Sequence, residues 1–283
     1  MIFDSLDVNA TNFYKNEGYL HIRNNDPQFI NKIKFLKDYY ENASPVDGDK
    51  AFRGPDGSPR QFVNIFRDVK SKSFDLYQSP LISSLINKFF SERAIFTHAK
   101  VSFKTPFKEA DWYFHQDNGY KSNHDLRSGF AIFICLEDMN EKNGCLKLVP
   151  RSHKLGKLEH VRKVEHEESG DNQLILPELP KGLDVHSVIS KRGDIIIFHS
   201  NTIHGSGSST VESRRLALIS EVEPYDRPKL DDYGVVPIFA KGELPYYDQA
   251  VLFLRKFVNP LSIWFLIKKR SPKLAAFIRK VRY

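Results

Sequence analysis

Eight short apolar runs, separated by turn-forming residues, dominate the chain from Ala94 onward. They are Ile95–Phe103, Trp112–Asp117, Phe130–Leu136, Cys145–Val149, Val185–Ile189, Asp194–Phe198, Thr202–Gly205 and Arg215–Val222. Turn sequences such as Glu141–Gly144 and Lys191–Asp194 lie between them. Short strands at this spacing, without alternating helices, are typical of a sandwich or barrel rather than a parallel α/β sheet. We therefore expect a jelly roll, the closed form of such a sandwich.

The residues before this β region predict flanking helices. Residues 8–43 show the apolar pattern of a helix, a strand and a second helix. Ser79 and Pro80 are typical of an N-cap followed by proline at the first helical position. The segment from Ser44 to Pro59 holds three Pro and three Gly, so we expect a loop there.

One domain accounts for most of the chain. We expect it to span residues 1–248, with a helical flank at 1–93 and the β core at 94–225, followed by a helical tail at 249–283. The apolar share of 41% in 283 residues is enough for a sizeable core. The polar stretch from His153 to Lys181 is long, and we expect an insertion or a lid over one mouth of the barrel.

The net charge of +7 belongs to the C-terminal tail. Seven of the 42 basic residues lie between Lys268 and Tyr283 with no acidic residue among them, which leaves 35 basic against 35 acidic residues elsewhere. A neutral body is a poor surface for nucleic-acid phosphates, so no nucleic-acid partner is expected. The tail predicts either a helix packed on the barrel or an interfacial helix that contacts an anionic membrane. The packed helix is the favoured interpretation.

Cysteine usage and the N-terminus indicate a cytoplasmic protein. Cys135 and Cys145 are the two cysteines, and both lie in apolar runs where a buried, small, hydrophobic role is expected. Without a disulfide framework the chain fits a reducing compartment. Residues 1–7 lack the pattern of a secretory signal, and no apolar run approaches the ~20 residues of a spanning helix.

His115 and Asp117 form the most informative polar motif. Two residues apart on an extended strand, they project to the same side and are able to bind one metal ion. A second histidine would complete the facial triad of two histidines and one carboxylate that is diagnostic of non-haem Fe(II) oxygenases. His204 is the candidate, and we prefer it to His199 because Gly205–Gly207 lets the backbone approach a ligand. The ordinary alternative is a surface strand with local hydrogen bonds.

Arg215 follows His204 by eleven residues and opens a further expected strand. A guanidinium aimed into a barrel holds a carboxylate through two parallel N–H···O bonds, as a 2-oxo acid would require. Arg214 competes with Arg215 for this role. Adjacent strand residues face opposite sides, so only one of the two points inward, and their spacing alone leaves both open.

Taken in order, these motifs resemble the phytanoyl-CoA dioxygenase family of Fe(II)/2-oxoglutarate-dependent oxygenases. The resemblance spans residues 10–225 and implies a mainly β fold with flanking helices, built on a double-stranded β-helix (a cupin-like jelly roll). The matching residues are His115–Asn118, Leu136–Asp138, Asn143–Leu146, Pro150–His153, Gly193–Asp194, His204–Ser206 and Arg215.

The resemblance also implies ligands and cosubstrate contacts. By it, His115, Asp117 and His204 bind Fe(II), while Arg215, preferred now to Arg214, binds the distal carboxylate of 2-oxoglutarate with the assistance of Ser206. Two further cofactor-binding candidates are Lys100, on the strand where relatives place a polar cosubstrate contact, and Asn118. For Lys100 and its neighbours His98 and Lys104, an ordinary strand role is an equal alternative. Asn143, Gly144 and Pro150–His153 are expected to form turns.

The implied activity is hydroxylation of a C–H bond in a small-molecule metabolite, with O2 as oxidant and release of succinate and CO2. Because Asp117 keeps the carboxylate, no coordination position is freed for a halide, which disfavours halogenation. Two alternatives remain. One is a catalytically idle metal-binding domain that serves as a sensor or scaffold. The other is zinc-dependent hydrolysis, which would leave Arg215 and Ser206 without a role.

Overall fold

A computed structural model describes most of the N-terminal 224 residues. The described residues are 1–42, 50–53, 59–63, 74–77, 79–90, 94–104, 112–121, 129–164, 172–212 and 215–224. All of them belong to one compact unit, Met1–Lys241. Arg214 and the basic tail lie outside the described residues, so the predictions for them, including the domain boundary at residue 248, stay predictions.

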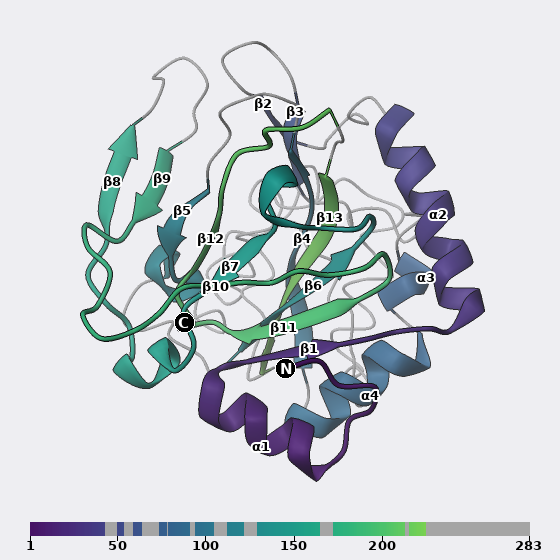
Figure 1. Cartoon of the computed structure of the whole chain (residues 1–283), viewed down its shortest axis with the longest axis horizontal. Coiled ribbons are helices and arrows are strands. Elements are labelled where there is room, and N and C mark those ends of the chain that lie inside the picture. The colour runs from purple at the N-terminus through teal and green to yellow at the C-terminus, as the bar shows by residue number, and fades with distance from the viewer. Residues whose placement is uncertain are drawn as a thin grey trace, which may run out of the picture. The chain divides into compact units, whose positions relative to one another are not determined.

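Two antiparallel sheets form the body of the molecule (Figure 1). The larger has the strand order β1-β11-β6-β13-β4-β3-β2, and the smaller has the order β10-β7-β12-β5. The larger sheet contains β1 (Tyr19–Ile22), β2 (Lys50–Arg53), β3 (Pro59–Val63), β4 (Ala94–Lys104), β6 (Phe130–Cys135), β11 (Ile195–His199) and β13 (Arg215–Pro224). The smaller contains β5 (Trp112–His115), β7 (Leu146–Leu148), β10 (His186–Ser187) and β12 (His204–Ser206). The predicted jelly-roll fold with flanking helices is confirmed.

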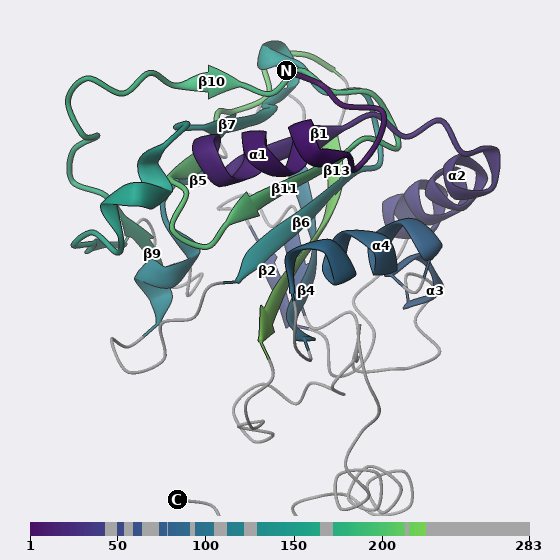
Figure 2. The same cartoon turned by 90° about the horizontal axis from the view of Figure 1, so that it is seen from below.

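The helices flank the two sheets, and most of them lie away from a separate hairpin. They are α1 (Val8–Glu17), α2 (Pro27–Asn42), α3 (Phe74–Tyr77) and α4 (Pro80–Phe89). Helices α2, α3 and α4 lie opposite the hairpin of β8 (Val161–Val164) and β9 (Asn172–Ile175) in both views (Figures 1 and 2). The expected helix–strand–helix order at the N-terminus is confirmed. So is the cap of α4, where the Ser79 hydroxyl accepts a hydrogen bond from the backbone N–H of Ile82.

Strand alternation divides the larger sheet between two cores. On β11, Ile195 and Ile197 pack into the cluster that contains the residues of α2 and α4. Ile196 and Phe198 instead join the cluster shared with Leu146 of the smaller sheet. Because successive side chains of a strand point to opposite faces, one face of the sheet supports the helices and the other is directed toward the site between the sheets.

Three local expectations need correction or extension. The predicted loop from Ser44 to Pro59 contains β2, which pairs with β3 as an antiparallel hairpin. The strand expected to reach Asp117 ends at His115. A 3-10 turn, η1 (Asp117–Tyr120), follows, and the Gly119 N–H donates to the carbonyl of Gln116. The expected insertion after His153 contributes the β8–β9 hairpin.

No helix among the described residues combines the length and apolar character needed to cross a lipid bilayer.

Asp194 is a structural residue whose replacement should destabilise the fold. Its carboxylate is fully buried and lies 2.8 Å from both His21 Nε2 and Arg23 Nε. It also accepts a hydrogen bond from the backbone N–H of Lys191 at 2.9 Å. Asp194→Ala leaves the side chains of His21 and Arg23 without their buried partner and is expected to lower the free energy of unfolding by about 3 kcal/mol. Urea denaturation of the full chain measures the loss.

Asp138→Ala is the matched control for this prediction. Its carboxylate lies at the same turn but is 58% exposed and pairs with Lys191 at 2.8 Å. An exposed pair of this kind contributes less than about 1 kcal/mol. Equal destabilisation by the two variants would contradict the structural role assigned to Asp194.

Candidate metal centre

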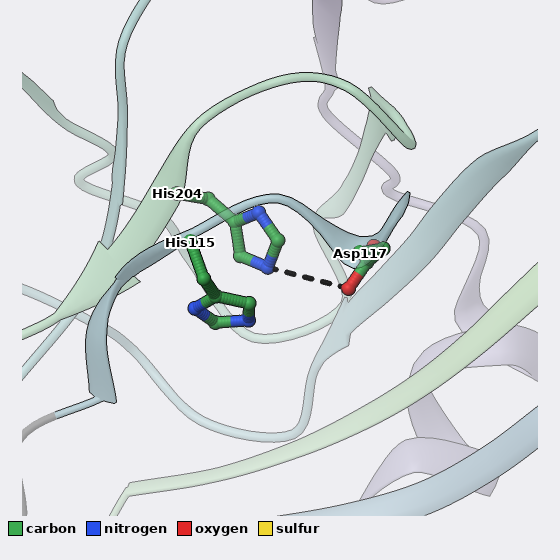
Figure 3. A group of neighbouring side chains, drawn as sticks. All are labelled: His115, Asp117 and His204. Atoms are coloured by element: carbon green, nitrogen blue, oxygen red, sulfur yellow. Dashed lines mark ion pairs between the residues drawn. The ribbon is translucent and has the colours of Figure 1, made fainter. Parts of the chain in front are cut away.

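The two sheet strands β5 and β12 bring the three predicted ligands together. They pair antiparallel with His204 directly opposite His115, and Asp117 follows two residues after His115 at the start of η1. The ligand atoms of the three side chains all lie within 4.8 Å of one another (Figure 3). His204 Nε2 lies 3.6 Å from Asp117 Oδ1. Within the described part of the chain this is the one group of His, Cys, Asp and Glu side chains with metal-binding spacing.

Both imidazoles are held in the form that binds metals. His115 Nδ1 lies 2.7 Å from the carbonyl oxygen of Tyr113, and His204 Nδ1 lies 3.0 Å from that of Thr202. A carbonyl oxygen only accepts, so each Nδ1 must carry the proton. Each Nε2 therefore keeps its lone pair and is available to bind a metal ion, and His204 Nε2 lies 3.6 Å from Asp117 Oδ1.

Burial keeps these histidines neutral. It lowers the pKa of His115 to about 3, with a further contribution from His204, and lowers the pKa of His204 to about 4. Burial and then the charge of Glu221 raise the pKa of Asp117. A cation between the three groups would reverse the effect on Asp117, because an adjacent positive charge favours the carboxylate.

The donor set fits a divalent metal ion. Asp117 Oδ2 is buried and has no hydrogen-bond partner among the described residues, an arrangement that is costly unless a ligand completes it. Two imidazole nitrogens and one carboxylate oxygen suit Fe(II) or Zn(II) and leave further coordination positions open. These residues are therefore able to hold the iron that the sequence predicts.

Gln116 positions the two ligands on either side of it, a role that the sequence reasoning missed. Its side chain is fully buried. Nε2 donates to the carbonyl oxygens of Gly156 and Asn201 at 2.8 and 2.7 Å, and Oε1 accepts from the backbone N–H of Leu158 at 2.8 Å. Asn201 precedes His204 by three residues, so one amide joins both ligand-bearing segments. The one sequence feature that could have indicated this role is the position of Gln116 between the two ligands His115 and Asp117.

Asn118 and Ser152 add to this support. The Asn118 amide donates to Asn201 Oδ1 at 2.7 Å, and its backbone N–H donates to the carbonyl of Ser200. Ser152 Oγ accepts from the backbone N–H of Ile203, beside His204, at 2.8 Å. The structure thus places Asn118 in the framework of the site, while a direct cofactor contact stays a prediction.

Arg215 is buried between the sheets with unpaired donors. It is 1% exposed, and neither its Nε nor its Nη1 has a hydrogen-bond partner among the described residues. Burial lowers its pKa to about 10, which leaves it charged at neutral pH. Its guanidinium carbon lies 5.2 Å from the centre of the Phe133 ring. Phe133 shares the inter-sheet cluster with Phe198, whose ring contacts His204, so Arg215 and the triad face the same space.

The remaining candidates differ in what the structure shows of them. Ser206 is buried two residues beyond His204 and shares its face of β12. Lys100 is half-buried opposite Ile219. Burial and the charge of Glu221 raise the pKa of Asp117, and the charge of Lys100, the next largest influence, lowers it. His199 lies outside the group, and its Nδ1 accepts from the backbone N–H of Asn201. The side chain of His98 lies outside the described residues.

Gln116→Leu should weaken metal binding more than it weakens the fold. Leucine removes the donor to both carbonyls, so the segments that carry Asp117 and His204 lose a shared hydrogen-bond partner. Loss of such an outer partner typically costs about 10- to 100-fold in metal affinity. Anaerobic Fe(II) titration gives the affinity, and circular dichroism checks the fold. Gln28→Leu, at an exposed position of α2, is the control, and unchanged affinity in Gln116→Leu would refute the positioning role.

Comparison with known proteins agrees with this geometry. The sequence profile of the family described as phytanoyl-CoA dioxygenase (PhyH) matches residues 14–217. A phytanoyl-CoA dioxygenase of Arabidopsis thaliana is 23% identical over 72% of this chain and 70% of its own length. An ectoine dioxygenase of Bordetella bronchiseptica is 21% identical over 73% and 71%.

Solved structures share the fold. EctD from S. alaskensis, crystallised with 2-oxoglutarate and 5-hydroxyectoine, superposes with a TM-score of 0.62 over 77% of this chain and 76% of that one, at 14% identity. The 2-oxoglutarate-dependent carbocyclase SnoK gives 0.61 over 84% and 94%, at 20% identity. The chain belongs to the phytanoyl-CoA dioxygenase family of non-haem iron and 2-oxoglutarate-dependent dioxygenases.

Proposed function

We propose that the protein hydroxylates a C–H bond of a small-molecule metabolite. The balanced reaction converts R–H, O2 and 2-oxoglutarate into R–OH, succinate and CO2. The observation that carries the proposal is the combination of two neutral imidazoles, an incompletely bonded carboxylate and a buried guanidinium with unpaired donors, all facing one inter-sheet space.

Each protein group has a distinct task in this proposal. His115, Asp117 and His204 would hold Fe(II), which supplies the activation of O2 coupled to decarboxylation of the 2-oxo acid. The carbonyl-bonded Nδ1 protons of His115 and His204 fix the orientation of both imidazoles, so that each Nε2 would be available to the metal ion. The apolar walls exclude water, which protects the reactive centre from side reactions.

Arg215 would anchor the cosubstrate. A buried guanidinium without partners is costly until a carboxylate supplies two charge-assisted hydrogen bonds, so it favours a dianion such as 2-oxoglutarate. Ser206, on the same face as His204, is proposed to assist this carboxylate. Lys100 and Asn118 are proposed as further polar contacts, the first through its ammonium and the second through its buried Oδ1.

The relatives carry names of several small substrates. They include an L-proline trans-4-hydroxylase of Streptomyces griseoviridis and a 2-aminoethylphosphonate dioxygenase, besides the ectoine and phytanoyl-CoA enzymes. This range supports a small metabolite as substrate without selecting one. A catalytically idle scaffold is the alternative, and the complete donor set with its unpaired arginine favours the enzyme.

Asp117→Ala should abolish turnover and reduce Fe(II) affinity strongly. The substitution removes the one carboxylate of the group, so two neutral imidazoles remain for the cation. Succinate release with Fe(II), 2-oxoglutarate and O2 measures turnover, and anaerobic Fe(II) titration measures affinity. Asp184→Ala, an exposed carboxylate, serves as the control. Full turnover in Asp117→Ala would refute the metal site.

Arg215→Gln should act on cosubstrate binding. It removes the charge and the fork that a carboxylate needs, at a cost of about 1.5–3 kcal/mol, or roughly 10- to 100-fold in the KM for 2-oxoglutarate. Steady-state succinate release at varied 2-oxoglutarate measures this, with Arg162→Gln on exposed β8 as control. An unchanged KM would exclude Arg215 as the anchor.

A further inference from the structure

The inner face of β13 carries charges of opposite sign at its two ends. Leu216, Leu218 and Val222 pack on the helix side, whereas Ala217 belongs to the inter-sheet cluster. By strand alternation the inner face of β13 therefore presents every second residue from Arg215 to Glu223. In order these residues are Arg215, Ala217, Ile219, Glu221 and Glu223.

The acidic end of this face meets the turn that carries Asp117. Lys121 directly follows η1, and its ammonium forms ion pairs with Glu223 and, at 3.3 Å, with Glu221. Burial works to lower the pKa of Lys121, but the two carboxylates outweigh it and raise the pKa. The three side chains are 11–15% exposed, so they border the site without being sealed in the core.

Of the two carboxylates, Glu221 lies closer to Arg215 along the inner face of β13. After burial, its charge is the largest influence raising the pKa of Asp117, and it also acts on His204. Glu223 lies one inner-face position further from Arg215. Glu221 is therefore the inner-face carboxylate that lies toward Arg215, and its ion pair with Lys121 places it beside the turn that begins at Asp117.

The charged side chains of Lys121 and Glu221 at the edge of the site favour one kind of substrate group. An acyl chain placed here would take Lys121 and Glu221 further out of water without replacing their hydration, which costs several kcal/mol. A protonated amine instead offers Glu221 a charge-assisted hydrogen bond, and the partly buried position strengthens that bond. Lys121 already shows that an ammonium fits against this carboxylate.

We propose that Glu221 is a specificity-determining residue that receives a protonated amine of the substrate, so that the substrate is a small amino compound rather than an acyl thioester. This inference rests on the proposed hydroxylase function. In the substrate-free protein Lys121 contacts the same carboxylate, and the substrate amine would bind beside it.

A substrate panel with the full chain tests the chemical class. The probes are the free proteinogenic amino acids, 2-aminoethylphosphonate, the N-acetyl derivative of each, and dodecanoyl-CoA. We expect at least one free amine to stimulate succinate release about tenfold over the substrate-free rate, and its N-acetyl derivative to fail, because acetylation removes the charge. The inference would be overturned if dodecanoyl-CoA or an N-acetylated probe stimulated succinate release, or if none of the free amines did.

Matched variants of β13 test the residue. Glu221→Gln keeps the side-chain shape and is expected to raise the KM for the stimulating amine about tenfold or more, and to narrow the preference for amine over N-acetyl derivative. Glu223→Gln removes the neighbouring charge and should preserve that preference. If Glu221→Gln lowered the succinate release stimulated by the amine and by its N-acetyl derivative to the same extent, the ion pair of Glu221 with Lys121 would be purely structural and the proposal would be refuted.

A binding readout separates this inference from the proposed function. Under anaerobic conditions, the visible charge-transfer band of protein with Fe(II) and 2-oxoglutarate reports the loaded site before any turnover. Absence of the band in the wild-type chain would refute the hydroxylase proposal itself. A normal band that the free amines leave unshifted, together with unstimulated succinate release, would refute only the amine inference.

Discussion

The antiparallel pairing of β5 with β12 places His115 directly opposite His204, and the rest of the site depends on that register. A slip of one residue would turn an imidazole to the opposite face of the sheet. Gly205 helps to hold the two strands close, since a Cβ at this position would lie 2.7 Å from the carbonyl oxygen of Trp112. The close approach of β5 and β12 therefore requires glycine at position 205, for a steric reason that is independent of metal binding.

The larger sheet supplies the complementary half of the arrangement because its two faces have different tasks. Alternation sends Leu216 and Leu218 into the helix-covered core, and sends Arg215 and Ala217 into the space shared with the smaller sheet. Apolar packing on one face offsets the cost of burying charged groups on the other. Apolar surroundings of this kind would strengthen the proposed interaction of Arg215 with an anion.

Much of this was predictable because it rests on short-range pattern. Strand alternation, turn residues and the His-x-Asp triplet together indicated a jelly roll with a metal group, and the three side chains do lie together. The strand assignment of Asp117 was wrong, since local hydrogen bonds such as that from the Gly119 N–H to the carbonyl of Gln116 close a 3-10 turn there, and the Asn118 N–H bonds to the distant carbonyl of Ser200. The task of Gln116 was equally hidden, because its partners lie 40 and 85 residues away. Contacts set by tertiary structure leave little trace in local sequence.

The separation of charges along β13 would allow one strand to serve the two proposed ligands. Arg215 and Glu221 are six residues apart, a distance of roughly 20 Å on an extended strand. At that distance they do not neutralise each other, and the apolar side chains of Ala217 and Ile219 lie between them. A cosubstrate anion at one end and a substrate cation at the other would therefore not compete for the same group. Reversing either charge would instead give both ends of the strand the same sign and leave one of the two ligands without an oppositely charged partner.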